Sequence, residues 1–185
     1  MKIFCNQMNI QVSPGLELRS LMLSDAHDIF HTIDSQRAYL GRWLPFVAYT
    51  KKLSDSEKFI ESVVNTPEDR FEHIFTIRKQ NGFVGLIGFR DTDPINKKTE
   101  IGYWLSQPFQ KQGIVTQSVR RLVEFAFDHM EINRIQIRCA VGNVASQKIP
   151  ETLGFKFEGV EREGELLAGN VFADLMVYSK LKSDG

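Results

Sequence analysis

Residues 105–116 read Leu-Ser-Gln-Pro-Phe-Gln-Lys-Gln-Gly-Ile-Val-Thr, and they join a strand-like segment to a long amphipathic helix. The preceding residues 99–105 are rich in β-branched and aromatic side chains, which favour a strand. After the junction, apolar residues recur at helical spacing, at Val115, Val119, Leu122, Val123, Ala126 and Phe127. The first N–H groups of a helix have no intrahelical partner and carry the positive end of its dipole. Together with Gly113, which lets a backbone approach closely, they predict a loop that holds a phosphate.

The length and charge of the chain exclude several classes of protein. Its 185 residues suit one domain, 1–185, with a sizeable core. Lys plus Arg and Asp plus Glu both number 23, so no overall field attracts nucleic acid or an anionic membrane. Polar residues interrupt the N-terminus too early for a secretory signal, and no apolar run approaches membrane-spanning length. Cys5 and Cys139 are far apart and are expected to be reduced thiols in a soluble, cytoplasmic protein.

Seven segments predict strands, namely 16–21, 73–78, 83–90, 99–105, 134–141, 155–162 and 171–181. Asn81-Gly82 predicts a tight hairpin between the second and third of them. A first helix is expected from the N-cap Ser24 to about Asp34, and the capping box at 54–57 starts a second helix that ends at Thr66-Pro67. A short helix should open at Asn143. The order predicts an α/β (α+β) fold, a mixed sheet with helices on both faces.

Two pairs of side chains could have a role in binding, but packing or simple exposure to solvent also explains them. His27 and His31 stand four apart on one helical face, a zinc spacing, but no third ligand is evident, so two solvated histidines and no metal are expected. Trp43 and Phe46 flank Pro45, which blocks a helix, and such aromatic residues either pack in the core or bind a ligand.

The loop sequence Gln110-x-x-Gly113-x-Val115 resembles the acyl-CoA pyrophosphate loop of the GNAT N-acetyltransferase superfamily, Gln/Arg-x-x-Gly-x-Gly/Ala. Val115 departs from this pattern, and its bulk predicts a slightly wider loop or a displaced diphosphate. The order of elements, Asn143-x-x-Ser146 and Leu153-Gly154-Phe155 extend the resemblance to nearly the whole chain. The segments 43–45, 100–104 and 153–159 resemble, more narrowly, the branch of bacterial ribosomal-protein N-terminal acetyltransferases.

This resemblance implies a GNAT fold with a mostly antiparallel seven-stranded sheet and helices on both faces. It implies acetyl-CoA as co-substrate, with pantetheine along residues 103–106, where the strand before the loop and the fifth strand splay apart. The implied cofactor-binding residues are Trp104, Leu105, Gln110, Lys111, Gln112, Gly113, Ile114, Val115, Thr116 and Asn143. Trp43 and Phe46, with the loop 164–170, are expected to hold the acceptor. Simple core packing is the alternative for Tyr103 or Trp104.

The favoured acceptor is the N-terminal α-amine of a ribosomal protein. A small-molecule amine, such as a polyamine, an antibiotic or an amino acid, is the alternative. A non-catalytic CoA-binding sensing module belongs to a different class and also stays open. The apolar strands at the C-terminus are able to support a homodimer.

The expected chemistry is direct attack of an amine on a thioester, which needs a base and an acid but no protein nucleophile. The resemblance places Glu100 as the base, with a solvated edge-strand carboxylate as the alternative. Ser146 is implied as the acid, because the position of the usual superfamily tyrosine is Pro150 here; the alternative for Ser146 is a helix N-terminus. Pro150 cannot donate to the Ser146 carbonyl, which predicts a bent helix and a free carbonyl facing the cofactor. Cys139 is expected to be a buried, inert thiol.

Overall fold

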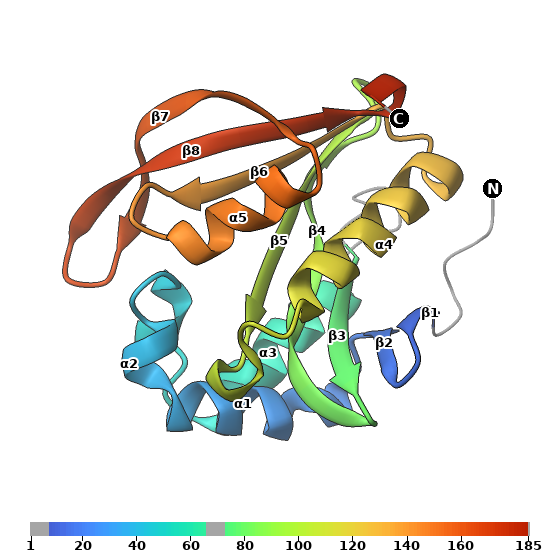
Figure 1. The fold of residues 1–185 in the computed structure, drawn as a ribbon. Helices are drawn as coiled ribbons and strands as arrows, with labels where there is room; N and C mark the ends of the chain where they lie inside the picture. Colours follow the sequence, from blue (N-terminus) through green and yellow to red (C-terminus); the bar gives the residue numbers. More distant parts are fainter. Residues whose placement is uncertain (1–7, 66–72, 185) are drawn as a thin grey trace.

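The computed structural model describes residues 8–65 and 73–184. These residues form one sheet in the order β1-β2-β3-β4-β5-β6-β8-β7 (Figure 1). All neighbouring strands are antiparallel except β5 and β6. The strands are β1 Asn9–Ser13, β2 Leu16–Ser20, β3 Ile74–Lys79, β4 Gly82–Asp93, β5 Lys98–Leu105, β6 Arg134–Ala140, β7 Lys156–Leu167 and β8 Val171–Leu181. The mixed, mostly antiparallel sheet is confirmed.

The expected seven strands are eight in the described part of the chain, because β1 was missed. β1 is an edge strand that pairs with β2 across a turn at Gly15, whose φ is 73°. Of its five residues only Ile10 is buried, so the strand carries little of the alternating hydrophobic signal from which strands are predicted.

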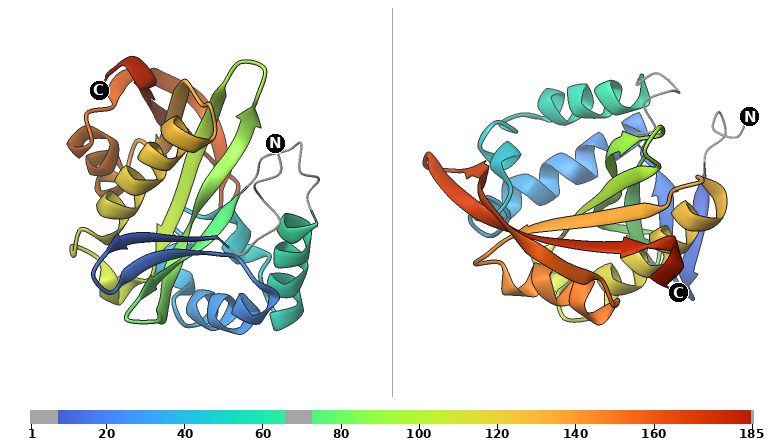
Figure 2. Two further views of the ribbon diagram at one scale, coloured as in Figure 1. Left: turned by 90° about the vertical axis from the view of Figure 1, so that its right-hand side faces the viewer. Right: turned by 90° about the horizontal axis from the view of Figure 1, so that it is seen from above.

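Helices cover both faces of the sheet, as expected (Figure 2). They are α1 Ala26–Ser35, α2 Arg37–Leu40, α3 Leu53–Val64, α4 Ile114–His129 and α5 Val144–Thr152. α4 packs on one face with side chains such as Val119 and Leu122, against Ile87 and Ile101 of the sheet. α1 and α3 pack on the other face against Leu86 and Trp104. None of the helices in the described residues is long and apolar enough to cross a membrane.

The predicted hairpin between β3 and β4 is confirmed, with its turn one residue earlier than expected. Gln80 and Asn81 have positive φ angles of 48° and 66°, as a two-residue hairpin turn requires. The backbone N–H of Gln80 donates to the carbonyl of Gly15 at 2.8 Å. This contact with the β1–β2 turn holds a residue that rarely adopts such a conformation.

The two predicted helix starts were wrong in detail. Ser24 lies inside a 3-10 turn, Leu23–Asp25, and α1 begins after it. α3 begins at Leu53, and the carboxylate of Asp55 accepts the backbone N–H groups of residues 51 and 52 at 2.9 and 3.0 Å, so Ser54 and Glu57 do not form the predicted capping box. The predicted end of this helix at 66–67, and Cys5, lie outside the described residues.

β5 and β6 diverge from each other, and the opening between them positions the functional site. They pair only at Lys98 with Arg134, Thr99 with Ile135 and Glu100 with Gln136. Beyond these pairs β5 continues to Leu105 and β6 to Ala140 without a shared ladder, so the sheet opens toward the N-terminus of α4. The expected splay is present, and on this side the β5 backbone groups beyond Glu100 have no strand partner in the part of the chain that the structure describes.

Candidate active site

A cavity of about 400 Å³ occupies the opening between β5 and β6. Five of the predicted site residues line it together: Trp43, Phe46, Trp104, Asn143 and Ser146. The loop at 110–116, Leu105 and Glu100 are not among its lining residues. The remaining walls come from α1, α3, β3, β4, β5, β6 and β7, and they include Ser56, Arg90, Tyr103, Arg138, Cys139 and Glu165.

The predicted phosphate loop ends at Gly113, the N-cap of the 16-residue α4, with φ 71°. Lys111 also has a positive φ, 60°, so the chain folds back sharply just before the helix. The first three N–H groups of α4 therefore point out of the helix without an intrahelical acceptor, which suits a diphosphate. Gln112 is held by Lys79, whose Nζ donates to Oε1 at 2.5 Å, and by the carbonyl of Pro108.

The side chain of Val115 does not lie at the mouth of the loop, where the expected widening of the loop requires it. Its side chain is buried with that of Ile114 in the core between α4 and the sheet. Only the backbone of these two residues is left to face a phosphate. The expected widening of the loop assumed a side chain at its mouth, whereas the amphipathic pattern of α4 turns this one inward.

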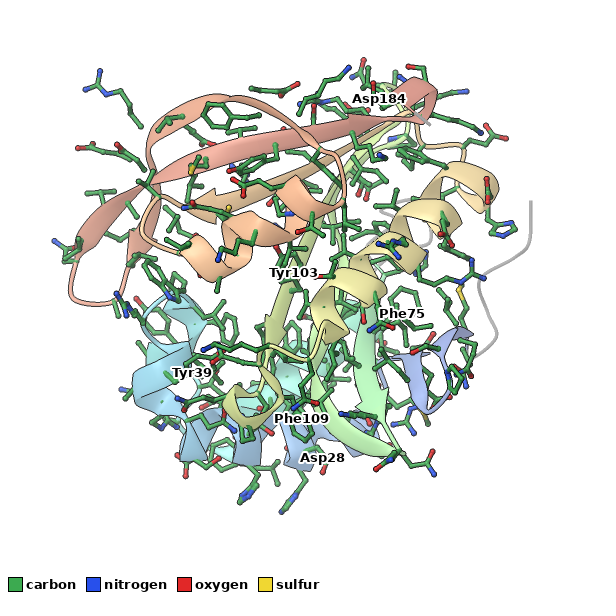
Figure 3. The ribbon with its side chains drawn as sticks, viewed as in Figure 1. Asp28, Tyr39, Phe75, Tyr103, Phe109 and Asp184 are labelled. Atoms are coloured by element: carbon green, nitrogen blue, oxygen red, sulfur yellow. The ribbon has the colours of Figure 1, made fainter. Side chains whose placement is uncertain are left out.

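The junction of α1 and α2 holds the loop from the opposite side. Gln36 donates from Nε2 to Ser106 Oγ at 2.8 Å and accepts the backbone N–H of Gln107 at 2.7 Å. Gln110 donates from Nε2 to the hydroxyl of Tyr39 at 2.7 Å. Burial raises the pKa of Tyr39, which therefore keeps its proton at neutral pH. Figure 3 labels Tyr39 on this junction. These contacts tie the loop to the half of the molecule that carries Trp43.

We expect that Tyr39→Phe weakens CoA binding about fivefold, because it removes the contact that orients Gln110, and one such hydrogen bond is worth about 1 kcal/mol net. Isothermal titration with CoA measures this. The matched control is Tyr49→Phe, since Tyr49 is 77% exposed. Equal dissociation constants for both variants and the unaltered protein would show that the Gln110 contact is irrelevant to the loop.

Ser146 is the third residue of the α5 N-terminus, and Asn143 is the N-cap, whose side chain accepts the Ser146 N–H at 3.3 Å. The hydroxyl of Tyr103 lies 3.1 Å from Ser146 Oγ and donates to the Ser146 carbonyl at 3.2 Å. The prediction of a free carbonyl was therefore wrong, because Tyr103 supplies the donor that Pro150 lacks. Figure 3 shows Tyr103 in the middle of the molecule, below α5.

Burial decides the protonation of two groups beside Ser146. Desolvation raises the pKa of the Tyr103 hydroxyl above its ordinary value, so Tyr103 is a permanent donor. Desolvation also raises the pKa of Cys139 to about 11, against the smaller opposing effect of the Ser146 contact. Cys139 is a buried free thiol, and a thiol with such a pKa is a poor nucleophile at neutral pH.

Glu100 is 3% exposed and forms ion pairs with Arg90 and Arg138. Arg138 Nε donates to its Oε2 at 2.6 Å, Arg90 Nε donates to its Oε1 at 2.7 Å, and Gln136 Nε2 donates at 3.2 Å. Both carboxylate oxygens of Glu100 are thus engaged by side chains of the sheet. The contacts favour a role in holding Arg90 and Arg138 at the cavity wall, while the role of Glu100 as base stays a prediction.

Glu165 is a cavity-lining carboxylate that the sequence reasoning missed. β7 is irregular between Glu161 and Glu165, and the carboxylate of Asp174 accepts the N–H of Glu163 within this bulge at 2.8 Å. Bulges re-aim the side chains that follow them. Burial raises the pKa of Glu165, against the opposing effect of Arg90 and Arg138. A raised pKa brings a carboxylate closer to the range that suits a general base.

The described geometry therefore combines the predicted phosphate loop at the start of α4, a strand opening, and a cavity lined by carboxylates and by the Ser146 hydroxyl. Residues 15–156 match the profile of the acetyltransferase (GNAT) domain. The chain belongs to the GNAT acetyltransferase family.

Similar proteins extend this assignment. The chain is 32% identical over 178 residues to the putative ribosomal N-acetyltransferase YdaF of Bacillus subtilis (strain 168), covering 94% of this chain and 95% of that protein. It is 28% identical over 172 residues to the ribosomal-protein-serine acetyltransferase of Escherichia coli (strain K12), covering 93% and 96%.

Two solved structures have the same fold. RimL, a ribosomal alpha-N-protein acetyltransferase in complex with coenzyme A, matches with a TM-score of 0.89 and 29% identity over 94% of this chain and 98% of that one. The microcin C7 self-immunity acetyltransferase MccE, in complex with acetyl-CoA and AMP, has a TM-score of 0.87 and 30% identity over 92% and 94%. This GNAT chain is an N-acetyltransferase that uses acetyl-CoA.

Trp43 separates the cavity at the strand opening, which we call the inner cavity, from a second, open groove of about 670 Å³. A Cβ atom on Gly142 would meet the indole at 2.9 Å, so the ring rests on the backbone just before Asn143. We call this second cavity the outer groove; its walls are Arg37, Ala38, Gly41, Arg42, Trp43, Val47, Ala48, Leu167, Ala168 and Val171.

The structure places the predicted acceptor segments as follows. Phe46, 40% exposed, lines the inner cavity, and Trp43 lines both cavities. Of the expected loop 164–170, residues up to Leu167 belong to β7, and the turn covers 168–170 with positive φ at Gly169 and Asn170.

His27 and His31 are exposed on α1, with parallel rings whose centres are 6.3 Å apart. Residues 8–65 and 73–184 contain no group of three or more side chains arranged to hold a metal ion.

Proposed function

We propose that this acetyltransferase modifies the N-terminal α-amine of a protein, with a ribosomal protein as the favoured acceptor, and that it acts as a single cytoplasmic domain. The observation that carries the proposal is the pairing of the Glu165 carboxylate and the Ser146 hydroxyl in one cavity at the strand opening. The names of the two relatives and of RimL support the choice of acceptor.

The reaction forms a C–N bond and breaks the thioester C–S bond. An α-amine has a reference pKa of about 7.7–8.0, so a modest base is enough to take its proton. Glu165 is the base that the cavity offers, with Glu100 as the candidate from the sequence. Ser146 donates a hydrogen bond to the leaving thiolate, and Tyr103 holds Ser146 in place. No covalent intermediate on Cys139 is required.

The cofactor-binding residues divide by the part of CoA that they would hold. The backbone of Lys111 to Thr116 would take the diphosphate at the start of α4. The unpaired edge of β5 at Trp104 and Leu105 would take the pantetheine amides, where the backbone has donors and acceptors free of a strand partner. Asn143 supports Ser146 through its N-cap contact.

A small-molecule amine is the second candidate acceptor. The neighbour MccE is a microcin C7 self-immunity acetyltransferase that was solved with acetyl-CoA and AMP, and its name and its bound AMP support this second candidate. A CoA-binding module without turnover is the remaining alternative. The charged groups in the cavity argue against it, because pantetheine alone does not require a carboxylate in the cavity wall.

Release of free thiol from acetyl-CoA by the purified protein tests these alternatives. We expect release with a peptide that has a free N-terminus, and little with the same peptide blocked at its N-terminus. Release only with polyamines or amino acids would favour the small-molecule reading. CoA binding without release on any acceptor would favour the sensing module.

A homodimer stays a prediction. β7 and β8 expose several apolar side chains, Phe157, Val160, Leu166, Val171 and Phe172, and such a surface is one that a second copy would cover. Light scattering on the purified protein measures the mass directly.

A further inference from the structure

The outer groove differs from the inner cavity in its charge. The inner cavity mixes two carboxylates, Asp55 and Glu165, with two arginines. The outer groove is lined by Arg37, Arg42 and apolar side chains, and no carboxylate is among its lining residues. An acceptor peptide that extends from the inner cavity into the outer groove therefore passes from side chains of both charges to positively charged side chains.

The two arginines of the groove are engaged to different degrees. Arg37 donates from Nε to Asp34 and from its two terminal nitrogens to the carbonyls of Val47 and Thr50, so its donors are occupied. Arg42 is exposed, and across the described residues its only recorded contact is with Trp43, whose ring centre lies 4.9 Å from the Arg42 guanidinium carbon. Arg42 thus lies over the Trp43 ring, and among the described residues its charge has no carboxylate partner.

Trp43 is the shared wall of the two cavities, so the outer groove lies directly beside the inner cavity. An extended peptide advances about 3.3–3.6 Å per residue. With its α-amine in the inner cavity, such a peptide would extend past the indole toward the groove with its next residues, the second and the third. The side chains at these positions then lie beside Arg42.

We propose that Arg42 selects acceptor proteins that carry a carboxylate side chain at the second or third residue. The proposal rests on the proposed function, since it requires a peptide acceptor. A guanidinium that stacks on an aromatic ring is already oriented, so it loses little freedom on pairing with a carboxylate. The apolar side chains of Leu167 and Val171, at the ends of β7 and β8 that flank the turn, would cover the stem of that acidic residue.

The test is a panel of peptides that share a free N-terminal serine and differ only at position 2 or 3, where they carry Glu, Gln or Lys. For the unaltered protein we expect kcat/KM to fall in the order Glu, Gln, Lys, with about a fivefold step for each change, the size of an exposed charge pair. The steps should shrink as salt is raised.

The variants separate charge recognition from support of Trp43. Arg42→Gln should flatten the order, Arg42→Glu should reverse it, and Arg42→Lys should keep it. Arg120→Gln is the matched control, because Arg120 is an exposed arginine on α4, on the other face of the sheet. A merely structural Arg42 would lower the rate for all peptides equally, and that result would overturn the proposal.

The outcomes also separate this proposal from the proposed function. Transfer to all peptides at equal rates would overturn the role of Arg42 alone. Absence of transfer to any peptide, with transfer to small amines, would overturn both.

Discussion

Glu165→Gln is expected to lower kcat/KM for peptide acetylation by about 10²–10⁴-fold, the contribution of a general base. A base must be deprotonated to act, so activity falls as pH drops through its pKa. Burial raises the pKa of Glu165, which places this fall at a higher pH than for an ordinary glutamate. We call this fall in activity at low pH the acidic limb of the pH profile. The variant should lose it and keep only the pH dependence that comes from ionisation of the acceptor amine. Thiol-release rates between pH 5 and 9 measure both effects.

Two comparison variants sharpen this result. Glu163→Gln changes an exposed carboxylate on the same bulge and should leave the profile unchanged. Glu100→Gln breaks the contacts to Arg90 and Arg138, so it should lower the melting temperature while keeping the acidic limb. If Glu100→Gln removes the limb and Glu165→Gln keeps it, then Glu100 is the base, as the sequence alone suggests.

Asp25→Ala is expected to lower the free energy of unfolding by about 3–5 kcal/mol, the cost of breaking a buried ion pair from one side. Asp25 is 1% exposed and pairs with Arg19 and, at 2.5 Å, with Arg78. Its carboxylate also accepts the backbone N–H of Met22 at 2.8 Å. The substitution leaves the largely buried Arg78 guanidinium with the carbonyl of Asn81 at 3.1 Å and the half-exposed carboxylate of Asp28 at 3.3 Å.

Urea unfolding measures this prediction, as a lower midpoint with an unchanged slope. The control is Asp34→Ala, whose partner Arg37 and whose own side chain are 35% and 56% exposed; such surface pairs contribute about 0–1 kcal/mol. If Asp25→Ala lowers the free energy of unfolding no more than the control does, the contacts of Asp25 with Arg19 and Arg78 do not stabilise the fold.

Local sequence was a good guide wherever a feature depends on neighbouring residues. The hairpin at Asn81 and the loop before α4 are features of this kind, because turn chemistry and helix periodicity are written in a few consecutive positions. The start of α1 was not predicted, because the carboxylate of Asp25 is committed to Arg78, which is 53 residues away. β1 was missed because an exposed edge strand buries too little to show a pattern.

The same distinction applies to the site. Ser146 and Asn143 stand out in a motif, but the hydroxyl that holds Ser146 comes from Tyr103, 43 residues earlier. Gln36 reaches the loop across 70 residues to Ser106. Glu165 faces the cavity because a bulge shifts the register of β7, and that bulge depends on Asp174 in the next strand. Pairing of this kind has no local signature.

The most direct test of the account is to locate the acetyl group on a peptide that offers both a free N-terminus and an internal lysine. The purified protein would be incubated with acetyl-CoA and this peptide, and fragment masses would assign the modified nitrogen. The account predicts acetylation of the α-amine alone, because a lysine amine with a reference pKa near 10.4 is far harder to deprotonate. Acetylation of the lysine, or of neither amine while small amines react, would contradict it.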